Sequence, residues 1–188
     1  PKPENRFRLP YAMAIDREGR IFVTDRGNRR VQIFDSEGQF VRTIGGRKNI
    51  GIRLSLPKPV ALDGFGNVYI GDRSARGARL VMIDRAGRLV KSLQVPFEAS
   101  SIGIVKDQLF IGTKETRSSA NIYFIGPDGN VARKIEECSP ESAVWETRVN
   151  AACAADGRIF LASEFLPAVR VYAPSGSLEM EFRYAPLT

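Results

Sequence analysis

Hydrophobic and polar residues alternate along this chain in short runs. Within residues 12–44 the runs are AMAID, IFVTD, VQIFD and FVRTI, and short polar segments that end in glycine, such as REG and SEG, separate them. A period of two with β-branched and aromatic residues is typical of half-buried strands, and glycine at the end of a short loop is typical of a hairpin. The pattern therefore predicts four antiparallel strands in a row over residues 9–45.

This unit of four runs repeats along the whole chain. LPYAMAIDREGRIFVTDRGN aligns with LPKPVALDGFGNVYIGDRSA, and two weaker copies follow. A unit of roughly 40 to 50 residues with four strands is typical of a β-propeller blade, which buries both faces of its sheet against neighbouring blades. We therefore predict an all-β fold with little helix, in which residues 1–188 form a single β-propeller domain or part of one. The predicted blades are residues 9–45, 56–93, 101–135 and 149–184.

The composition is that of a folded domain, and it narrows the possible chemistry. The 188 residues are 43% hydrophobic and 26% charged, with no histidine and two cysteines. Without histidine, Ser-His and Cys-His nucleophiles and histidine metal ligands are excluded, and two cysteines are too few for a four-cysteine zinc site. No apolar stretch reaches the about 20 residues of a membrane-spanning helix, so we expect no membrane insertion. The net charge of +7 is compatible with anionic partners.

The first unit resembles the NHL repeat. In that repeat a strand ends in Asp, a short Gly-Asn loop and an Arg follow, and the next strand ends in Phe-Asp. The second unit keeps Asp72 and Arg79 with a longer loop, the fourth keeps Arg170, and the third has Thr113 and Asn121 instead of the pair. The matching positions in the first unit are Asp25, Gly27, Asn28, Arg30, Val31, Phe34, Asp35 and Gly38.

The resemblance implies a β-propeller, but propellers of this family usually have six blades and only four units are visible here. Three arrangements are open: part of a six-bladed ring, a closed four-bladed ring, or an arc completed by another chain. We favour part of a six-bladed ring, with further blades supplied by a longer parent chain or by another subunit. An open arc would expose two apolar sheet faces, which a soluble monomer rarely does.

Two sets of charged residues suggest different roles. The pairs Asp25 with Arg30 and Asp72 with Arg79 recur once per repeat, so we interpret them as scaffold contacts that fix the loop between the second and third strands. The other set lies in these loops and in the link between units one and two, and it predicts a basic face for an anionic partner, the alternative being a solvated rim. The predicted binding residues are Arg26, Arg29, Arg47, Lys48, Arg53, Arg73, Arg76, Lys114 and Arg117.

No catalytic constellation is recognisable, and we predict no catalytic residue, no metal site and no cofactor. Propeller lyases that resemble this fold depend on histidine metal ligands, which this sequence lacks. Propeller lactonases bind calcium through carboxylates and amides. The carboxylates here lie in hairpin turns, where turn formation already explains them.

We therefore predict a non-enzymatic β-propeller scaffold that binds a protein or another macromolecule through its loops. The alternatives are an RNA- or polyanion-binding module and, less favoured, a calcium-dependent lactonase. The basic loops of the first two units contain no aromatic residue on which bases could stack, which weakens the RNA alternative. Bacterial proteins that look like this one are commonly exported, so we expect an extracytoplasmic location.

The cysteines and the single tryptophan complete the set of candidate residues. Cys153 aligns with Ile15 on a first strand, so we expect it to be buried as a small hydrophobic side chain. Whether it pairs with Cys138 is open. Trp145 lies in the long link at residues 136–150, and we expect it to cap the local core, the alternative being a partner contact.

Overall fold

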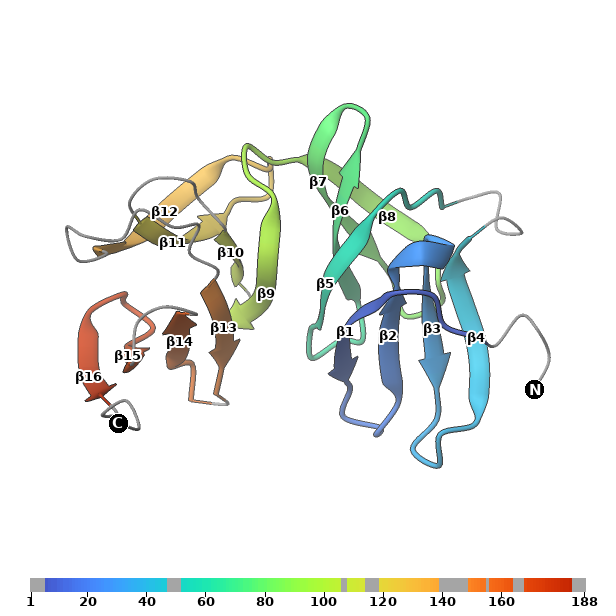
Figure 1. Ribbon diagram of the computed structural model, residues 1–188, viewed down its shortest axis with the longest axis horizontal. Coiled ribbons are helices and arrows are strands. Elements are labelled where there is room, and N and C mark those ends of the chain that lie inside the picture. Colours follow the sequence, from blue (N-terminus) through green and yellow to red (C-terminus); the bar gives the residue numbers. More distant parts are fainter. Residues whose placement is uncertain are drawn as a thin grey trace, which may run out of the picture. The chain divides into compact units, whose positions relative to one another are not determined.

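The structure, a computed structural model, describes residues 6–46, 52–105, 108–113, 119–138, 149–154, 156–163 and 168–183. Their strands form four antiparallel sheets of four strands each, and within every sheet the strands follow in chain order (Figure 1). Helix in the described part is confined to the 3₁₀ turn Arg26–Asn28. The predicted all-β fold of four-stranded blades is therefore confirmed.

We number the sheets as blades 1 to 4 in chain order. Blades 1 and 2 consist of β1 (Pro10–Ile15), β2 (Ile21–Asp25), β3 (Arg30–Phe34), β4 (Phe40–Gly45), β5 (Pro57–Leu62), β6 (Val68–Ser74), β7 (Gly77–Ile83) and β8 (Leu89–Gln94). Blades 3 and 4 consist of β9 (Ala99–Val105), β10 (Gln108–Thr113), β11 (Ser119–Ile125), β12 (Val131–Cys138), β13 (Val149–Cys153), β14 (Ile159–Ser163), β15 (Ala168–Tyr172) and β16 (Leu178–Arg183).

The chain divides into two compact units, and each has a core of its own. Unit 1 is residues 1–98 and holds blades 1 and 2, and unit 2 is residues 99–188 and holds blades 3 and 4. In unit 1 the core lies between the two sheets, because side chains alternate across a strand and one face of each blade points at the other blade. The buried residues of this core are Phe22, Val31, Ile33, Ile44, Ile52, Leu54, Val60, Val68, Ile70, Val81 and Ile83.

We call the face of a blade that points to the following blade of its unit the trailing face, and the opposite face the leading face. In unit 1 the trailing face of blade 1 packs against the leading face of blade 2. Unit 2 repeats this arrangement between blades 3 and 4. Its core residues are Phe110, Ile122, Phe124 and Ile135 from blade 3 and Ile159, Leu161 and Tyr172 from blade 4.

Aspartates close the hairpins at one end of the blades. In the turn between β1 and β2, Asp16 Oδ1 accepts the backbone N–H groups of Glu18 and Arg20 at 2.9 and 2.8 Å. Asp35 and Asp63 accept two backbone N–H groups each in the same way. Such a side chain satisfies turn donors that the ladder leaves unpaired. The glycine that follows can adopt a positive φ without strain, as at Gly38 with φ 77°.

The core contacts give a matched pair of substitutions. Ile33 is 1% exposed on the trailing face of blade 1, and Ile15 is 62% exposed on the leading face of the same sheet. We expect Ile33→Ala to lower the free energy of unfolding by about 2–4 kcal/mol because it leaves a cavity. Ile15→Ala should cost under about 1 kcal/mol because little surface is buried there. Urea unfolding of the three proteins measures the difference, and equal losses would contradict the described core.

Asp16 makes stability depend on pH. Partial burial opposes its ionisation, but the side-chain and backbone hydrogen bonds from Arg20 and the charge of Arg20 hold the pKa of Asp16 below its ordinary value. A lowered folded pKa adds stability above the unfolded pKa of about 4, and that stability is lost as the pH falls through the folded pKa. We therefore expect Asp16→Asn to lose less stability than the native chain between pH 6 and pH 2.

The matched control for this experiment is Glu179→Gln. Glu179 is exposed, and no described residue bonds its carboxylate, yet the substitution removes the same charge. Chemical unfolding at each pH should give the control the same acid sensitivity as the native chain. Identical pH profiles for all three proteins would show that the hairpin of Asp16 does not contribute to the loss of stability in acid.

Candidate functional site

Asp25 ends β2 and is the centre of a buried polar cluster. Its Oδ1 accepts the backbone N–H of Arg8 at 2.7 Å, and its Oδ2 accepts Asn28 Nδ2 at 2.7 Å and Arg30 Nε at 2.8 Å. The residue is 0% exposed, and a buried carboxylate needs such donors because burying an unpaired charge is costly. Arg30 Nη2 also donates to Arg6 O at 3.0 Å. The cluster thus fastens the segment that precedes β1 to the end of β2.

Asp72 repeats this arrangement at the end of the corresponding strand β6 of blade 2. It accepts the backbone N–H groups of Ser55 and Leu56, at 3.0 and 2.7 Å to Oδ1. Arg79 donates to its Oδ2 from Nε at 3.0 Å and from Nη2 at 2.7 Å, and the same Nη2 donates to Arg53 O. Both Asp-Arg pairs therefore hold the link that enters their own blade. Within each pair the two charges neutralise each other.

The pairs do not extend to the fourth blade, where our expectation for Arg170 was wrong. Arg170 lies six residues before the hairpin glycine of its blade, which is the position of Gln32 in blade 1 and not that of Arg30. Its Nε donates to Glu181 Oε2 at 2.6 Å on the neighbouring strand. Ser163 and Ala168 stand where blade 1 has Asp25 and Arg30, so the sequence offered no Asp-Arg pair to fix the register.

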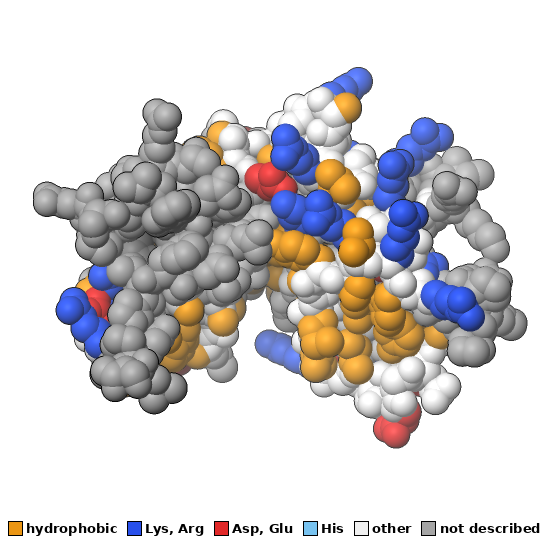
Figure 2. Space-filling model, viewed as in Figure 1, with side chains coloured by type: hydrophobic (Ala, Val, Ile, Leu, Met, Phe, Trp, Pro, Cys, Tyr) orange, Lys and Arg blue, Asp and Glu red, His pale blue; other side chains and the backbone are white. Residues whose placement is uncertain are grey.

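The loops between β2 and β3 and between β6 and β7 lie at the same end of unit 1 as the links. Gly27 N–H donates to Arg8 O at 2.7 Å, and Arg73 N–H donates to Leu56 O at 3.4 Å, so each loop contacts the link of its blade. We call this end, residues 6–9, 26–29, 53–56 and 73–76, the link rim. Figure 2 shows Lys and Arg side chains spread along this end of the unit.

Most basic side chains of the link rim have no partner. The guanidinium groups of Arg6, Arg8, Arg26, Arg29, Arg53 and Arg76 form no hydrogen bond or ion pair with any residue that the structure describes. Arg73 differs, because it lies 3.3 Å from Glu98 Oε2, which is shared with Lys58. Since Asp25 and Asp72 are neutralised by Arg30 and Arg79, the rim carries a net positive charge. Arg8 was missed from sequence, and its position in the link before β1 is the signal that could have found it.

Four predicted binding residues, Arg47, Lys48, Lys114 and Arg117, lie outside the described residues, as does Trp145. Arg26, Arg29, Arg53, Arg73 and Arg76 are the predicted residues that the structure brings to the link rim.

The first blade is similar in sequence to known proteins. Residues 7–34 match the NHL repeat. The chain contains an NHL repeat. The matched segment runs from the link through β2 to the end of β3, so it includes Asp25 and its donors Arg8, Asn28 and Arg30. Protein lin-41 of Caenorhabditis elegans is 50% identical over 32 residues, and human NHL repeat-containing protein 3 is 44% identical over 32 residues. These matches cover 17% of this chain and 3% and 9% of the two proteins.

Solved structures match nearly the full length of the chain. Virginiamycin B lyase from Staphylococcus aureus has a TM-score of 0.66 at 15% identity, over 99% of this chain and 58% of that one. A gluconolactonase from Xanthomonas campestris has a TM-score of 0.67 at 15% identity, over 95% of this chain and 63% of that one. A chain of a nidogen/laminin complex has a TM-score of 0.67 at 14% identity, over 95% and 65%. Identities this low show the propeller-type fold alone, and this chain spans less than two thirds of each.

Other hairpins in each unit hold carboxylates of the same kind. Asp84 and Asp156 resemble Asp16, because backbone hydrogen bonds from Arg88 and Arg158 hold the pKa of each carboxyl low. Among the described residues, no three carboxylates or cysteines come together as metal ligands. In that same part of the chain, no helix is long and apolar enough to span a bilayer.

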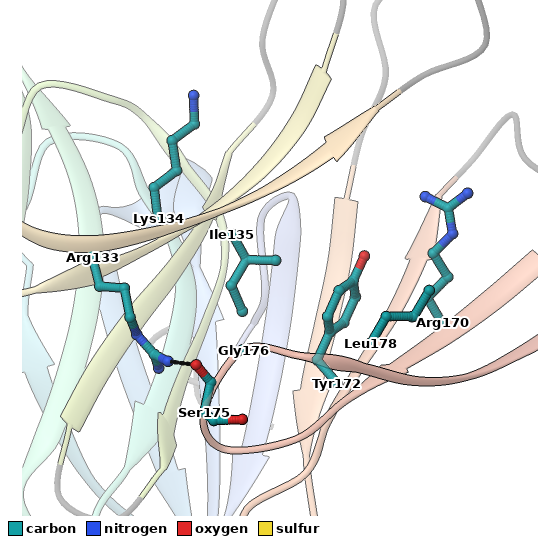
Figure 3. A pocket seen from close by; sticks show the side chains of 8 residues that line it. All are labelled: Arg133, Lys134, Ile135, Arg170, Tyr172, Ser175, Gly176 and Leu178. Atoms are coloured by element: carbon teal, nitrogen blue, oxygen red, sulfur yellow. Dashed lines mark hydrogen bonds between the residues drawn. The ribbon is translucent and has the colours of Figure 1, made fainter.

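Unit 2 has a cleft of about 520 Å³ between blades 3 and 4 that the sequence did not indicate (Figure 3). Arg133 and Ile135 line it from β12, and Arg170 and Tyr172 line it from β15. The Lys134 side chain is directed away from it. Hydrogen bonds from Arg183 and Arg170 hold the pKa of Glu181 below its ordinary value, so the charge of Arg170 is already paired. The cleft is therefore a weaker anion site than the link rim.

The expected burial of Cys153 was wrong. Cys153 is a free, exposed thiol, and its Sγ lies 3.1 Å from Ile104 O of blade 3. It does lie on the first strand of its blade, as Ile15 does, and Ile15 is exposed as well.

The Asp25 cluster can be tested with a matched pair of arginines. Arg30→Ala removes two hydrogen bonds and leaves Asp25 without its cationic partner, so we expect the free energy of unfolding to fall by about 2–3 kcal/mol. Arg76→Ala removes the same atoms from an exposed, unpartnered side chain and should stay within about 0.5 kcal/mol of the native chain. Thermal and urea unfolding measure both. Equal stability of the two variants would contradict the scaffold role of the pair.

Proposed function

We propose that this chain is a β-propeller scaffold that binds an acidic protein surface through the link rim of blades 1 and 2. The observation that carries the proposal is the set of six guanidinium groups there that have no partner among the described residues. The guanidinium group of arginine binds a planar carboxylate with two parallel hydrogen bonds. An arginine without a partner in the protein has no ion pair to break when it binds such a group. A nidogen/laminin complex contains a chain of this fold, so propellers of this type do occur in protein complexes.

A protein partner is favoured over RNA by what the two loops lack. Residues 26–29 and 73–76 include no aromatic side chain. Single-stranded nucleic acid is usually held by aromatic side chains on which bases stack, in addition to a basic groove. Phosphate contacts alone would give weak, sequence-independent binding that falls steeply with salt.

Catalysis is less well supported, although lyase and gluconolactonase structures share the fold. A histidine-to-alanine variant of virginiamycin B lyase is catalytically inactive, and the present 188 residues contain no histidine. The hairpin carboxylates are occupied by turn N–H groups and arginines. An extracytoplasmic location stays part of the proposal, based on the resemblance to exported propellers.

The proposal predicts a response to charge reversal at the link rim. We expect the chain to bind fluorescein-labelled poly-L-glutamate, and Arg29→Glu with Arg76→Glu to weaken binding by about tenfold or more at 50 mM salt. Binding by the native chain should also fall between 50 and 200 mM salt, because bound counterions are released. Fluorescence anisotropy measures both affinities.

The control carries the same net charge change at the opposite rim, with Arg17→Glu and Arg88→Glu. The affinity of this control for poly-L-glutamate should fall by less than about threefold, because the substitutions change only the overall electrostatic field of the protein. A 20-nucleotide random RNA is the competitor. If the RNA displaces poly-L-glutamate at lower concentration than unlabelled poly-L-glutamate does, the polyanion alternative replaces the protein partner. Equal losses in the two double variants would remove the link rim as a site.

A further inference from the structure

Two residues of the link rim hold a backbone conformation that glycine adopts without strain. Among the described residues, the non-glycine residues with a positive φ are Leu9, at 51°, and Arg29, at 57°. An L-residue in this region brings its Cβ close to a backbone carbonyl, so leucine and arginine there cost stability. Strained backbone of this kind concentrates at places that bind ligands. In the described part of this chain, both such residues lie in blade 1 of the link rim.

Backbone hydrogen bonds hold the two strained residues close to each other. The carbonyl of Arg29 accepts the N–H of Gly46 at 2.9 Å, which fixes the backbone of the loop. Leu9 directly follows Arg8, whose carbonyl accepts the N–H of Gly27 at 2.7 Å. A Cβ at Gly27 would lie 2.6 Å from Arg8 O, so the loop and the link are in close contact. The rim therefore presents an apolar and a cationic side chain from one bonded pair of segments.

Leu9 is exposed because of its place on the rim. Its side chain is 68% exposed, and Leu56 holds the equivalent position of blade 2, since each leucine precedes the proline that begins a first strand. Leu56 is 38% exposed although blade 1 packs against the leading face of blade 2. The position thus remains accessible where a neighbouring blade is already in place.

The two leucines lie at neighbouring points of unit 1. Two residues after each leucine stand Tyr11 and Lys58, and Lys58 Nζ lies 5.8 Å from the centre of the Tyr11 ring. This contact places the beginnings of β1 and β5 side by side (Figure 1). Figure 2 shows hydrophobic side chains among the Lys and Arg side chains at this end of the unit. The link rim is therefore a mixed surface, apolar as well as basic.

A mixed surface of this kind selects among anionic ligands. Carboxylates can pair with the guanidinium groups, but a ligand made only of carboxylates would leave Leu9 in water. A purely apolar ligand would bury the guanidinium groups without partners, which is costly. A nucleic acid would bring bases, which stack on aromatic side chains and not on leucine. An acidic polypeptide with an aliphatic side chain among its carboxylates satisfies both kinds of side chain.

We propose that the link rim binds an acidic segment of a protein partner that carries an aliphatic side chain between its carboxylates. Leu9 contacts the aliphatic side chain, and Arg29 pairs with a neighbouring carboxylate. This inference rests on the proposed function and adds the apolar group that the partner must supply. Glycine or asparagine would suit the positive φ of both positions better, so the stability of the fold does not explain the leucine and the arginine that stand there.

Two fluorescein-labelled peptides test the apolar contact. Both have the same length and the same glutamates, and they differ only in a central leucine or serine. We expect the native chain to bind the leucine peptide about tenfold more tightly at 50 mM salt, because part of the leucine side chain leaves water. Leu9→Asn should reduce this preference to less than about twofold and leave the affinity for the serine peptide unchanged. Fluorescence anisotropy measures the affinities.

Arg29→Asn tests the paired carboxylate. It should weaken both peptides by about fivefold or more, because one charge-assisted pair is lost from each complex. Asparagine tolerates a positive φ, so the urea midpoints of Leu9→Asn and Arg29→Asn should equal or exceed that of the native chain. These midpoints also show that both variants fold.

The matched controls lie in hairpins away from the link rim. Phe65 is 73% exposed between β5 and β6, and Phe65→Asn should keep the tenfold preference for the leucine peptide. Arg17 is exposed between β1 and β2, and Arg17→Asn should weaken both peptides by less than about twofold.

The outcomes separate this inference from the proposed function. Equal affinity of the native chain for the two peptides, or a preference that Leu9→Asn keeps, would overturn the apolar contact while the basic rim still binds acidic ligands. A preference that Phe65→Asn also removes would overturn it as well. If neither peptide binds, or if Arg29→Glu with Arg76→Glu changes neither affinity, the proposed function fails and this inference fails with it.

Discussion

A four-stranded sheet with aliphatic side chains on both faces is stable only where both faces are covered, and the rest of this structure depends on that requirement. Burial of a valine or isoleucine side chain contributes about 1.5–3 kcal/mol, whereas an isolated small sheet is marginal in water. Ile33 and Ile70 meet this requirement because blades 1 and 2 cover each other. Met13 and Ile15 occupy the other face of blade 1 and are 66% and 62% exposed.

Covering a face also requires that the blades keep a fixed spacing, which polar contacts at the two ends of the strands provide. At one end, Asp25 and Asp72 hold the links that carry the chain into each blade. At the other end, Arg42 and Arg133 reach the hairpin of the next blade. The charges of the two rims follow from this arrangement. The aspartates at the link rim are buried and paired, so the arginines of its loops project without partners.

The periodic features of this fold could be predicted from the sequence, because they depend on local rules. Glycine at each hairpin and alternation within each strand fix the four sheets, and the Asp-Arg spacing indicates the two pairs of unit 1. Features that depend on register or on a neighbouring sheet could not be predicted. Arg170 was placed two residues from its true equivalent because Ser163 and Ala168 replace the Asp and the Arg of the pair there, and Cys153 was expected to be buried from strand pattern alone. Arg42 and Arg133 look like ordinary exposed charges until the hairpin of the following blade is in place.

The charge of the link rim follows from the contacts that hold its shape. Asp25 and Asp72 are buried and bonded to Arg30 and Arg79, so they do not offset the arginines of residues 26–29 and 73–76. Because blades 1 and 2 place these two segments at the same end of unit 1, a ligand that reaches both would make linked contacts. Linked contacts raise the apparent affinity through effective concentration rather than through stronger single contacts.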